Sequence, residues 1–75
     1  MDRQMEALQR IRAEHAHRAD ALVGASVGGR RIGEAEAGLY PVTVPGKGTT
    51  FWRAVEVIRA HGEARLNGLP ILRGA

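Results

Sequence analysis

The chain has 75 residues, with eleven Lys and Arg against eight Asp and Glu, and its formal net charge is +3. This length allows at most one domain with a small core, and the absence of cysteine excludes a disulfide framework and a thiolate metal site. The sequence contains no run of about 18 apolar residues, so no segment is expected to cross a membrane.

Residues 1–23 predict one long amphipathic helix. This segment is rich in Ala, Leu, Arg, Glu and Gln and contains neither Gly nor Pro, while Gly24 follows as a stop signal. Apolar or semi-apolar side chains recur at nearly every turn and form a stripe: Met5, Leu8, Ile11, His15 and Leu22. Because the rest of the chain has little bulk to cover this stripe, it is predicted to contact a protein partner or a second copy.

The start of the chain carries charges at Asp2, Arg3, Glu6 and Arg10. These charges interrupt the apolar stretch that a secretory signal peptide requires. The expected location is therefore the cytoplasm or a virion, with no membrane partner.

The middle of the chain, residues 24–50, holds most of the glycines and predicts extended structure joined by turns. Gly28-Gly29 is typical of a tight two-residue hairpin turn. Residues Leu39–Val44 are the best strand candidate, since Tyr, Val and Thr suit a pleated surface. Pro41 cannot donate to a ladder, so this strand is expected at the edge of a sheet.

A second helix is predicted over residues 51–61, with Thr49 or Thr50 as its N-cap. After Gly62, residues 62–75 are expected to form a hairpin or an extended tail, because Asn67-Gly68 is a strong hairpin signal. The fold class is therefore α+β in a single domain: a long N-terminal helix, a Gly-rich β middle, a short helix and a C-terminal hairpin or tail.

No residue pattern predicts catalysis. Gly46-Lys47-Gly48 lacks the glycine spacing and the hydroxyl after Lys that a phosphate loop needs. His15 and His17 stand two apart on a helix, so they point in different directions and cannot share a metal ion. We therefore expect a protein that is not an enzyme and holds neither a cofactor nor a metal.

Tyr40, Phe51 and Trp52 are the aromatic residues of the chain. On a helix over 51–61, Phe51 lies on the apolar face and is expected in the core. Trp52 lies about 100° further round, which makes it the predicted exposed contact for a partner.

Residues 55–71 resemble the helix-then-hairpin segment of a small RNA-binding module shared by some ribosomal proteins and pseudouridine synthases. The resemblance lies in Val55 and Ile58, in Gly62-Glu63-Ala64-Arg65-Leu66-Asn67-Gly68, and in Pro70-Ile71. A generic helix and hairpin would contain the same residues. The resemblance implies phosphate contacts from Arg53, Arg59 and Arg65.

The sequence thus predicts a small non-enzymatic structural or assembly subunit that docks through its N-terminal helix. Its order of elements is similar to that of small head-completion proteins of tailed phages, so a virion protein of the head or the head–tail joint is the most concrete form. A basic nucleic-acid-binding module using the C-terminal half and an accessory subunit of an enzyme complex are the alternatives.

Overall fold

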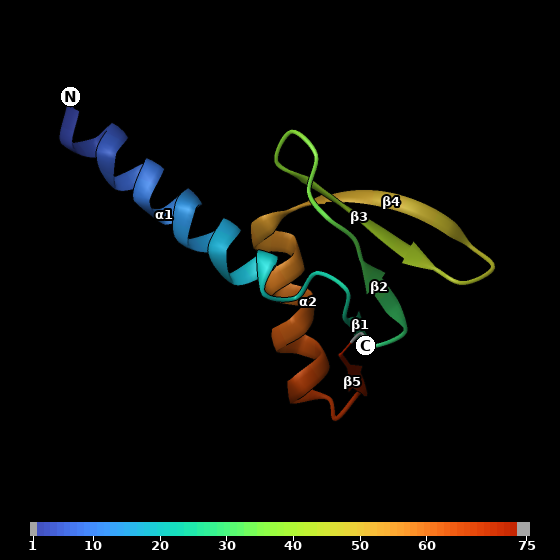
Figure 1. Ribbon diagram of the computed structural model, residues 1–75. Coiled ribbons are helices and arrows are strands. Elements are labelled where there is room, and N and C mark those ends of the chain that lie inside the picture. Colours follow the sequence, from blue (N-terminus) through green and yellow to red (C-terminus); the bar gives the residue numbers. More distant parts are fainter. Residues whose placement is uncertain (1, 74–75) are drawn as a thin grey trace.

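The computed structural model describes residues 2–73 and confirms an α+β fold. Two helices accompany five short strands (Figure 1). In chain order the elements are α1 (Asp2–Asp20), β1 (Ser26–Val27), β2 (Arg30–Ile32), β3 (Leu39–Val44), β4 (Gly48–Arg53), α2 (Ala54–Leu66) and β5 (Ile71–Leu72).

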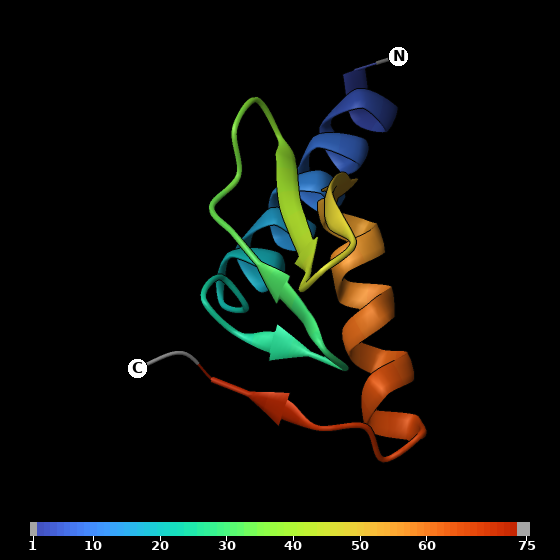
Figure 2. The same ribbon diagram turned by 90° about the vertical axis from the view of Figure 1, so that its right-hand side faces the viewer.

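The strands form one antiparallel sheet in the order β4-β3-β2-β1-β5. Helix α2 lies against one face of this sheet and the opposite face is open, while α1 packs against α2 and meets the sheet near its own C-terminal end (Figures 1 and 2). Helix α2 leaves one edge strand, β4, and the chain after it returns to the other edge strand, β5, so α2 crosses beneath the whole sheet.

The core lies between the sheet and the two helices. Its fully buried large side chains are Tyr40, Ile32, Val42 and Val57. Helix α1 contributes Ala19, and Leu22 follows in the turn after it. The N-terminal part of α1 extends beyond this core, which explains why the molecule measures 45 Å along its longest axis but 26 and 21 Å across.

The first helix ends earlier than predicted. Its last backbone hydrogen bond of α-helical spacing joins the N–H of Ala21 to the oxygen of His17 at 3.3 Å, and the N–H of Leu22 then turns to Ala19 at 2.9 Å. Gly24 (φ +87°) completes the turn and donates to Ile32 at 2.8 Å. The helix is therefore tightened at its end so that the chain can enter β1.

The Gly28-Gly29 hairpin is confirmed. Val27 pairs with Arg30 across it, and both glycines have positive φ (58° and 84°). A type I′ turn needs positive φ at both central residues, and glycine adopts this conformation without steric cost.

The Leu39–Val44 strand is confirmed, but its expected place at the sheet edge is wrong, because β3 lies between β2 and β4. The oxygen of Pro41 accepts from the N–H of Gly33 at 2.8 Å, so the ring nitrogen of Pro41 also faces the β2 side. The β2 strand ends at Ile32, just where the missing donor would be needed. The ladder with β4 is therefore unaffected, and Pro41 is tolerated inside the sheet.

The predicted helix over 51–61 is wrong at its start. Residues Gly48–Arg53 form β4, and the Pro45–Lys47 turn joins two strands rather than a strand and a helix. Helix α2 begins at Ala54, where Glu56 Oε1 accepts a hydrogen bond from the N–H of Arg53 at 3.1 Å. Glu56 thus satisfies one of the free N–H groups at the helix start, and neither Thr49 nor Thr50 is a cap.

For the C-terminal segment the hairpin alternative is wrong, whereas the extended-tail alternative holds from Leu69 on, where the chain leads into β5. Helix α2 continues through Ala64 and Arg65 to Leu66, and Asn67-Gly68 ends it. Gly68 (φ +67°) donates to Arg65 at 3.3 Å, and Leu69 donates to Ala64 at 2.8 Å, which is the Schellman pattern of a helix end. The final strand β5 pairs with β1 instead, so the hairpin of the RNA-binding module is absent from residues 2–73.

Candidate docking groove

The apolar stripe has both surface and core residues, because it continues past the end of α1 into the turn that holds Leu22. Met5, Leu8 and Ile11 are 62%, 54% and 48% exposed, whereas Leu22 is only 6% exposed. Leu22 therefore belongs to the core and is not available to a partner, contrary to the prediction. The surface part of the stripe consists of Met5, Leu8 and Ile11, with His15 half-buried at its inner end.

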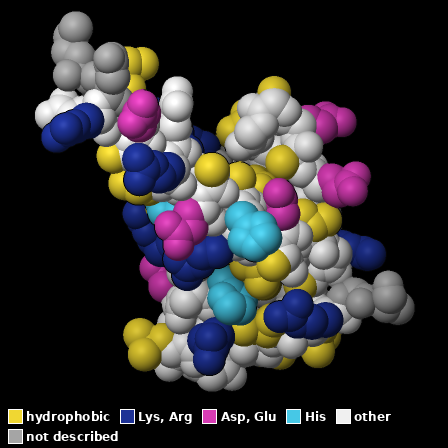
Figure 3. All heavy atoms as spheres, turned by 60° about the vertical axis from the view of Figure 1, so that its left-hand side comes forward, with side chains coloured by type: hydrophobic (Ala, Val, Ile, Leu, Met, Phe, Trp, Pro, Cys, Tyr) yellow, Lys and Arg dark blue, Asp and Glu magenta, His cyan; other side chains and the backbone are white. Residues whose placement is uncertain are grey.

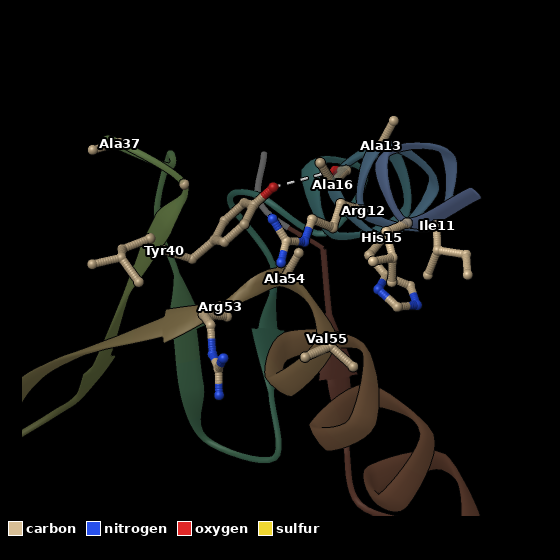
Figure 4. Close-up of a pocket in the computed structure, with 13 residues that line it drawn as sticks. Ile11, Arg12, Ala13, His15, Ala16, Ala37, Tyr40, Arg53, Ala54 and Val55 are labelled. Carbon is tan, nitrogen blue, oxygen red and sulfur yellow. Dashed lines mark hydrogen bonds between the residues drawn. The ribbon is translucent and has the colours of Figure 1, made fainter. Parts of the chain in front are cut away.

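The exposed stripe continues into a groove of about 800 Å³ between α1, the start of β3 and the junction of β4 with α2 (Figure 4). In the space-filling view, hydrophobic side chains lie along α1 and on the lobe that faces it (Figure 3). The apolar lining consists of Leu8, Ile11, Ala13, Ala16, Ala37, Leu39, Ala54 and Val55. We call this hollow the docking groove.

Tyr40 fixes the geometry of the docking groove. Its hydroxyl is 2.6 Å from Asp20 Oδ1 and 3.2 Å from the backbone oxygen of Ala16, so one buried side chain of β3 holds two positions of α1 (Figure 4 shows the second bond). Burial raises the pKa of Tyr40 to about 12, and the Asp20 carboxylate adds to this rise. The Tyr40 hydroxyl therefore remains a neutral donor at ordinary pH.

The charged side chains that line the docking groove are two arginines. Arg12 points from α1 toward Tyr40, and Arg53 stands at the start of α2 (Figure 4). No Asp or Glu lines the groove within the described residues. The Arg53 guanidinium does contact Glu56 outside the groove, with Nε and Oε1 3.4 Å apart, but both side chains are solvent-exposed and the pair is weak.

The predicted roles of Phe51 and Trp52 are reversed in the structure. Phe51 is 60% exposed on the open face of the sheet, while Trp52 is half-buried against the core. The Arg30 guanidinium covers the indole, 5.2 Å from the ring centroid. The prediction failed because side chains alternate between faces on a strand, whereas a helix would have placed Phe51 inward.

The three arginines predicted to bind nucleic acid do not form one basic surface. Arg53 contacts Glu56, and Arg59 lies beside Glu56 and Glu63. Arg65 is six positions after Arg59 and so lies about 120° away from it around the axis of α2. Positive and negative side chains therefore alternate along this helix.

Arg65 lies instead near His61. Burial lowers the pKa of the His61 imidazole, and the positive charges of Arg65, Arg73 and Arg18 lower it further. This groups Arg65 with the end of α1 and with the end of the chain, and not with Arg53 or Arg59.

The sequence did not predict the wall of the docking groove that the β3–β4 hairpin and the start of α2 place opposite α1. Leu39, Ala54 and Val55 line the docking groove although they lie far from the stripe in sequence. Their placement depends on β4 being a strand, so the only available signal was the run of β-branched and aromatic residues at 49–52.

Comparison with protein-family models, with curated proteins and with solved structures found no match. Among residues 2–73, no three His, Asp or Glu side chains gather as metal ligands would. Neither of the helices in this part of the chain has the length and apolarity needed to cross a bilayer.

Proposed function

We propose that this chain is a small non-enzymatic assembly subunit that docks into a larger protein complex through α1. The observation that carries the proposal is the exposure of Met5, Leu8 and Ile11 along one side of a helix whose other end is held in the core. Covering such apolar surface stabilises a complex by roughly 25 cal/mol per Å² removed from water.

The docking groove suggests how the partner is bound. The exposed stripe and the groove form one continuous apolar surface, because Leu8 and Ile11 belong to both. An amphipathic helix laid along α1 would place successive apolar side chains in this groove. Arg12 and Arg53 at its sides favour a partner segment with Asp or Glu beside its apolar residues.

A strained residue lies at the same place. Ala37 has φ +52° and is the one non-glycine residue with positive φ among those described, in the turn that joins Glu36 to Leu39. Such a conformation costs roughly 1–2 kcal/mol for a residue with a Cβ. Strain of this kind is often found where a surface is shaped for a ligand, and Ala37 lines the docking groove.

Virion structural or head–tail joining proteins are the most concrete members of this class, and accessory subunits of enzyme complexes are the next. Both would use the same surface of α1. The nucleic-acid alternative has less support, because Arg53 and Arg59 are each accompanied by acidic side chains.

The test compares two double variants with equal changes in charge. Leu8→Asp with Ile11→Asp places charges in the stripe, and the control, Arg10→Gln with His17→Asp, makes the same change of charge on the opposite side of α1. In the wild type, we expect an association through α1 that the first pair abolishes and the control retains. Light scattering and sedimentation over a range of concentrations measure the association.

Backbone hydrogen exchange gives the second readout. In a monomer, the first turns of α1 should exchange quickly, because their side chains have nothing to pack against; in the assembly they should become protected. A wild type that is monomeric at about 100 µM, with residues 3–11 protected as strongly as the core strands, would contradict the proposal.

A further inference from the structure

The two edges of the sheet are protected to different degrees. The edge strand β5 has only two residues and follows Pro70, so it offers little to a new strand. The edge strand β4 has six residues, and it forms the border of the sheet in Figure 1. Its residues 48–51 are all solvent-exposed.

The register of the sheet identifies which backbone groups of β4 face outward. The N–H of Leu39 and the oxygen of Pro41 bond on the β2 side, so the intervening Tyr40 bonds on the β4 side, with its pairing partner Trp52. By the same alternation, Thr49, Phe51 and Arg53 direct their N–H and C=O groups away from β3. These groups form the free edge of β4.

Only Thr49 and Phe51 retain free groups on this edge. The N–H of Arg53 already donates to Glu56 at 3.1 Å. The oxygen of Arg53 lies at the N-cap position, where a carbonyl accepts the first hydrogen bond of the helix. A new strand can therefore bond to the N–H and C=O groups of Thr49 and Phe51 and to no others between Gly48 and Arg53.

We propose that β4 pairs antiparallel with β4 of a second copy of this chain, with Thr50 opposite the second copy's Thr50. This pairing sets Thr49 opposite the second copy's Phe51, and Phe51 opposite the second copy's Thr49. All the free backbone groups of both edges are satisfied by this arrangement. The pairing joins two five-stranded sheets into one continuous sheet.

The side chains agree with the same register. Trp52 comes opposite the second copy's Gly48, and a Cβ built on Gly48 meets nothing within 4 Å, so an indole has room there. Covering an edge glycine with an aromatic side chain is a recognised way of fixing register. The Phe51 side chain is 60% exposed on the open face of the single chain, and part of it is buried by the second copy in the dimer.

Charge does not oppose the pairing. No charged side chain lies within residues 48–52. Lys47 comes opposite the second copy's Arg53, whose guanidinium is already 3.4 Å from Glu56, so Lys47 meets a pair of no net charge. The edge also lacks the Lys, Pro or bulge that monomeric proteins use to prevent strand addition.

The decisive variant is Phe51→Pro in the full chain. It removes an outward N–H from each copy without touching the ladder between β3 and β4. Sedimentation equilibrium should show a wild-type dimer with a dissociation constant in the micromolar range, weakened about thirty-fold by this variant. The amides of Thr49 and Phe51 should exchange more slowly as the wild-type concentration rises.

Phe51→Lys is the second variant, because an exposed position tolerates it without loss of the fold, and it also weakens the dimer. The matched control is Leu66→Lys, which replaces a side chain that is 86% exposed at the far end of α2 and leaves the dimer intact. Circular dichroism and thermal melting confirm that each variant is folded.

The inference is overturned if the wild type remains monomeric at about 500 µM, or if both Phe51 variants associate as strongly as Leu66→Lys. Leu8→Asp with Ile11→Asp must leave the β4 dimer unchanged. Association that is lost in that double variant but retained in both Phe51 variants would support docking through α1 and reject pairing through β4.

Discussion

The two halves of α1 have the same amphipathic pattern but different surroundings. In the C-terminal half, Ala19 is fully buried, and Ala16 and Asp20 accept the Tyr40 hydroxyl. In the N-terminal half, Leu8 and Ile11 remain about half exposed. An apolar stripe on a helix therefore does not by itself show which of its residues the rest of the chain buries.

The difference follows from how far the sheet and α2 extend. Core-facing residues such as Ile32, Val42 and Val57 pack where α1 ends. On the N-terminal side of His15, α1 faces the turn before β3 and the start of α2 across the docking groove. The N-terminal half is thus positioned by the rest of the helix, and it contributes surface rather than core.

The largest expected effect separates Leu8, in the N-terminal half of α1, from Leu22, in the turn just after α1. Leu22→Ala should lower the free energy of unfolding by about 2–4 kcal/mol, because it leaves a cavity in the core. Leu8→Ala should change it by no more than about 0.5 kcal/mol in the monomer. Urea denaturation of both variants, below the concentration at which the chain associates, measures the two values. Equal losses would mean that Leu8 is packed as tightly as Leu22.

The next effect concerns the hydrogen bonds that hold the C-terminal half of α1 to β3. Tyr40→Phe removes the hydroxyl that donates to Asp20 and Ala16, and should cost about 1–2 kcal/mol. Because the folded pKa is raised from 10.0 to about 12, the stabilising contribution is present below pH 10 and lost as pH rises toward 12. Melting between pH 8 and 11.5 should show this alkaline loss in the wild type and not in Tyr40→Phe. An unchanged alkaline slope would show that Tyr40 does not titrate as expected.

The smallest effect concerns the turn that faces the exposed half. Ala37→Gly relieves the positive φ and should raise the free energy of unfolding by about 0.5–1 kcal/mol, after the entropy that glycine loses on folding. Thermal melting detects a change of this size. If the strain shapes the docking groove, the stabilised variant should associate less tightly through α1. A variant that is less stable than the wild type would contradict the assignment of strain.

The sequence was sufficient for α1, for the Gly28-Gly29 turn and for the strand at Leu39–Val44, because each depends on local preference. It was misleading where one signal serves two structures. Asn67-Gly68 favours a hairpin, yet glycine with positive φ equally ends a helix. The choice depends on whether the preceding residues are helical, and Gly62 concealed that α2 continues to Leu66.

Part of the candidate site was predictable for a similar reason. Helix periodicity predicts that Met5, Leu8 and Ile11 share one face of α1, while their exposure depends on how far the sheet and α2 extend. The other wall of the docking groove, including Leu39 and Val55, depends on contacts between distant segments. The prediction of a helix over residues 51–53 also assigned Phe51 and Trp52 to the wrong environments. Successive side chains point to opposite faces of a strand, whereas on a helix they are about 100° apart.

Pro41 has a consequence for how this protein could diversify. It cannot complete a second hydrogen bond to Gly33, and a Cβ at Gly33 would come within 2.7 Å of the proline ring, so both residues hold the end of β2 in place. Residues 34–35 therefore do not pair with the sheet, and pairing resumes at the bridge between Glu36 and Leu39. Insertions at residues 34–35, just before the turn that lines the docking groove at Ala37, would therefore leave the strand registers unchanged.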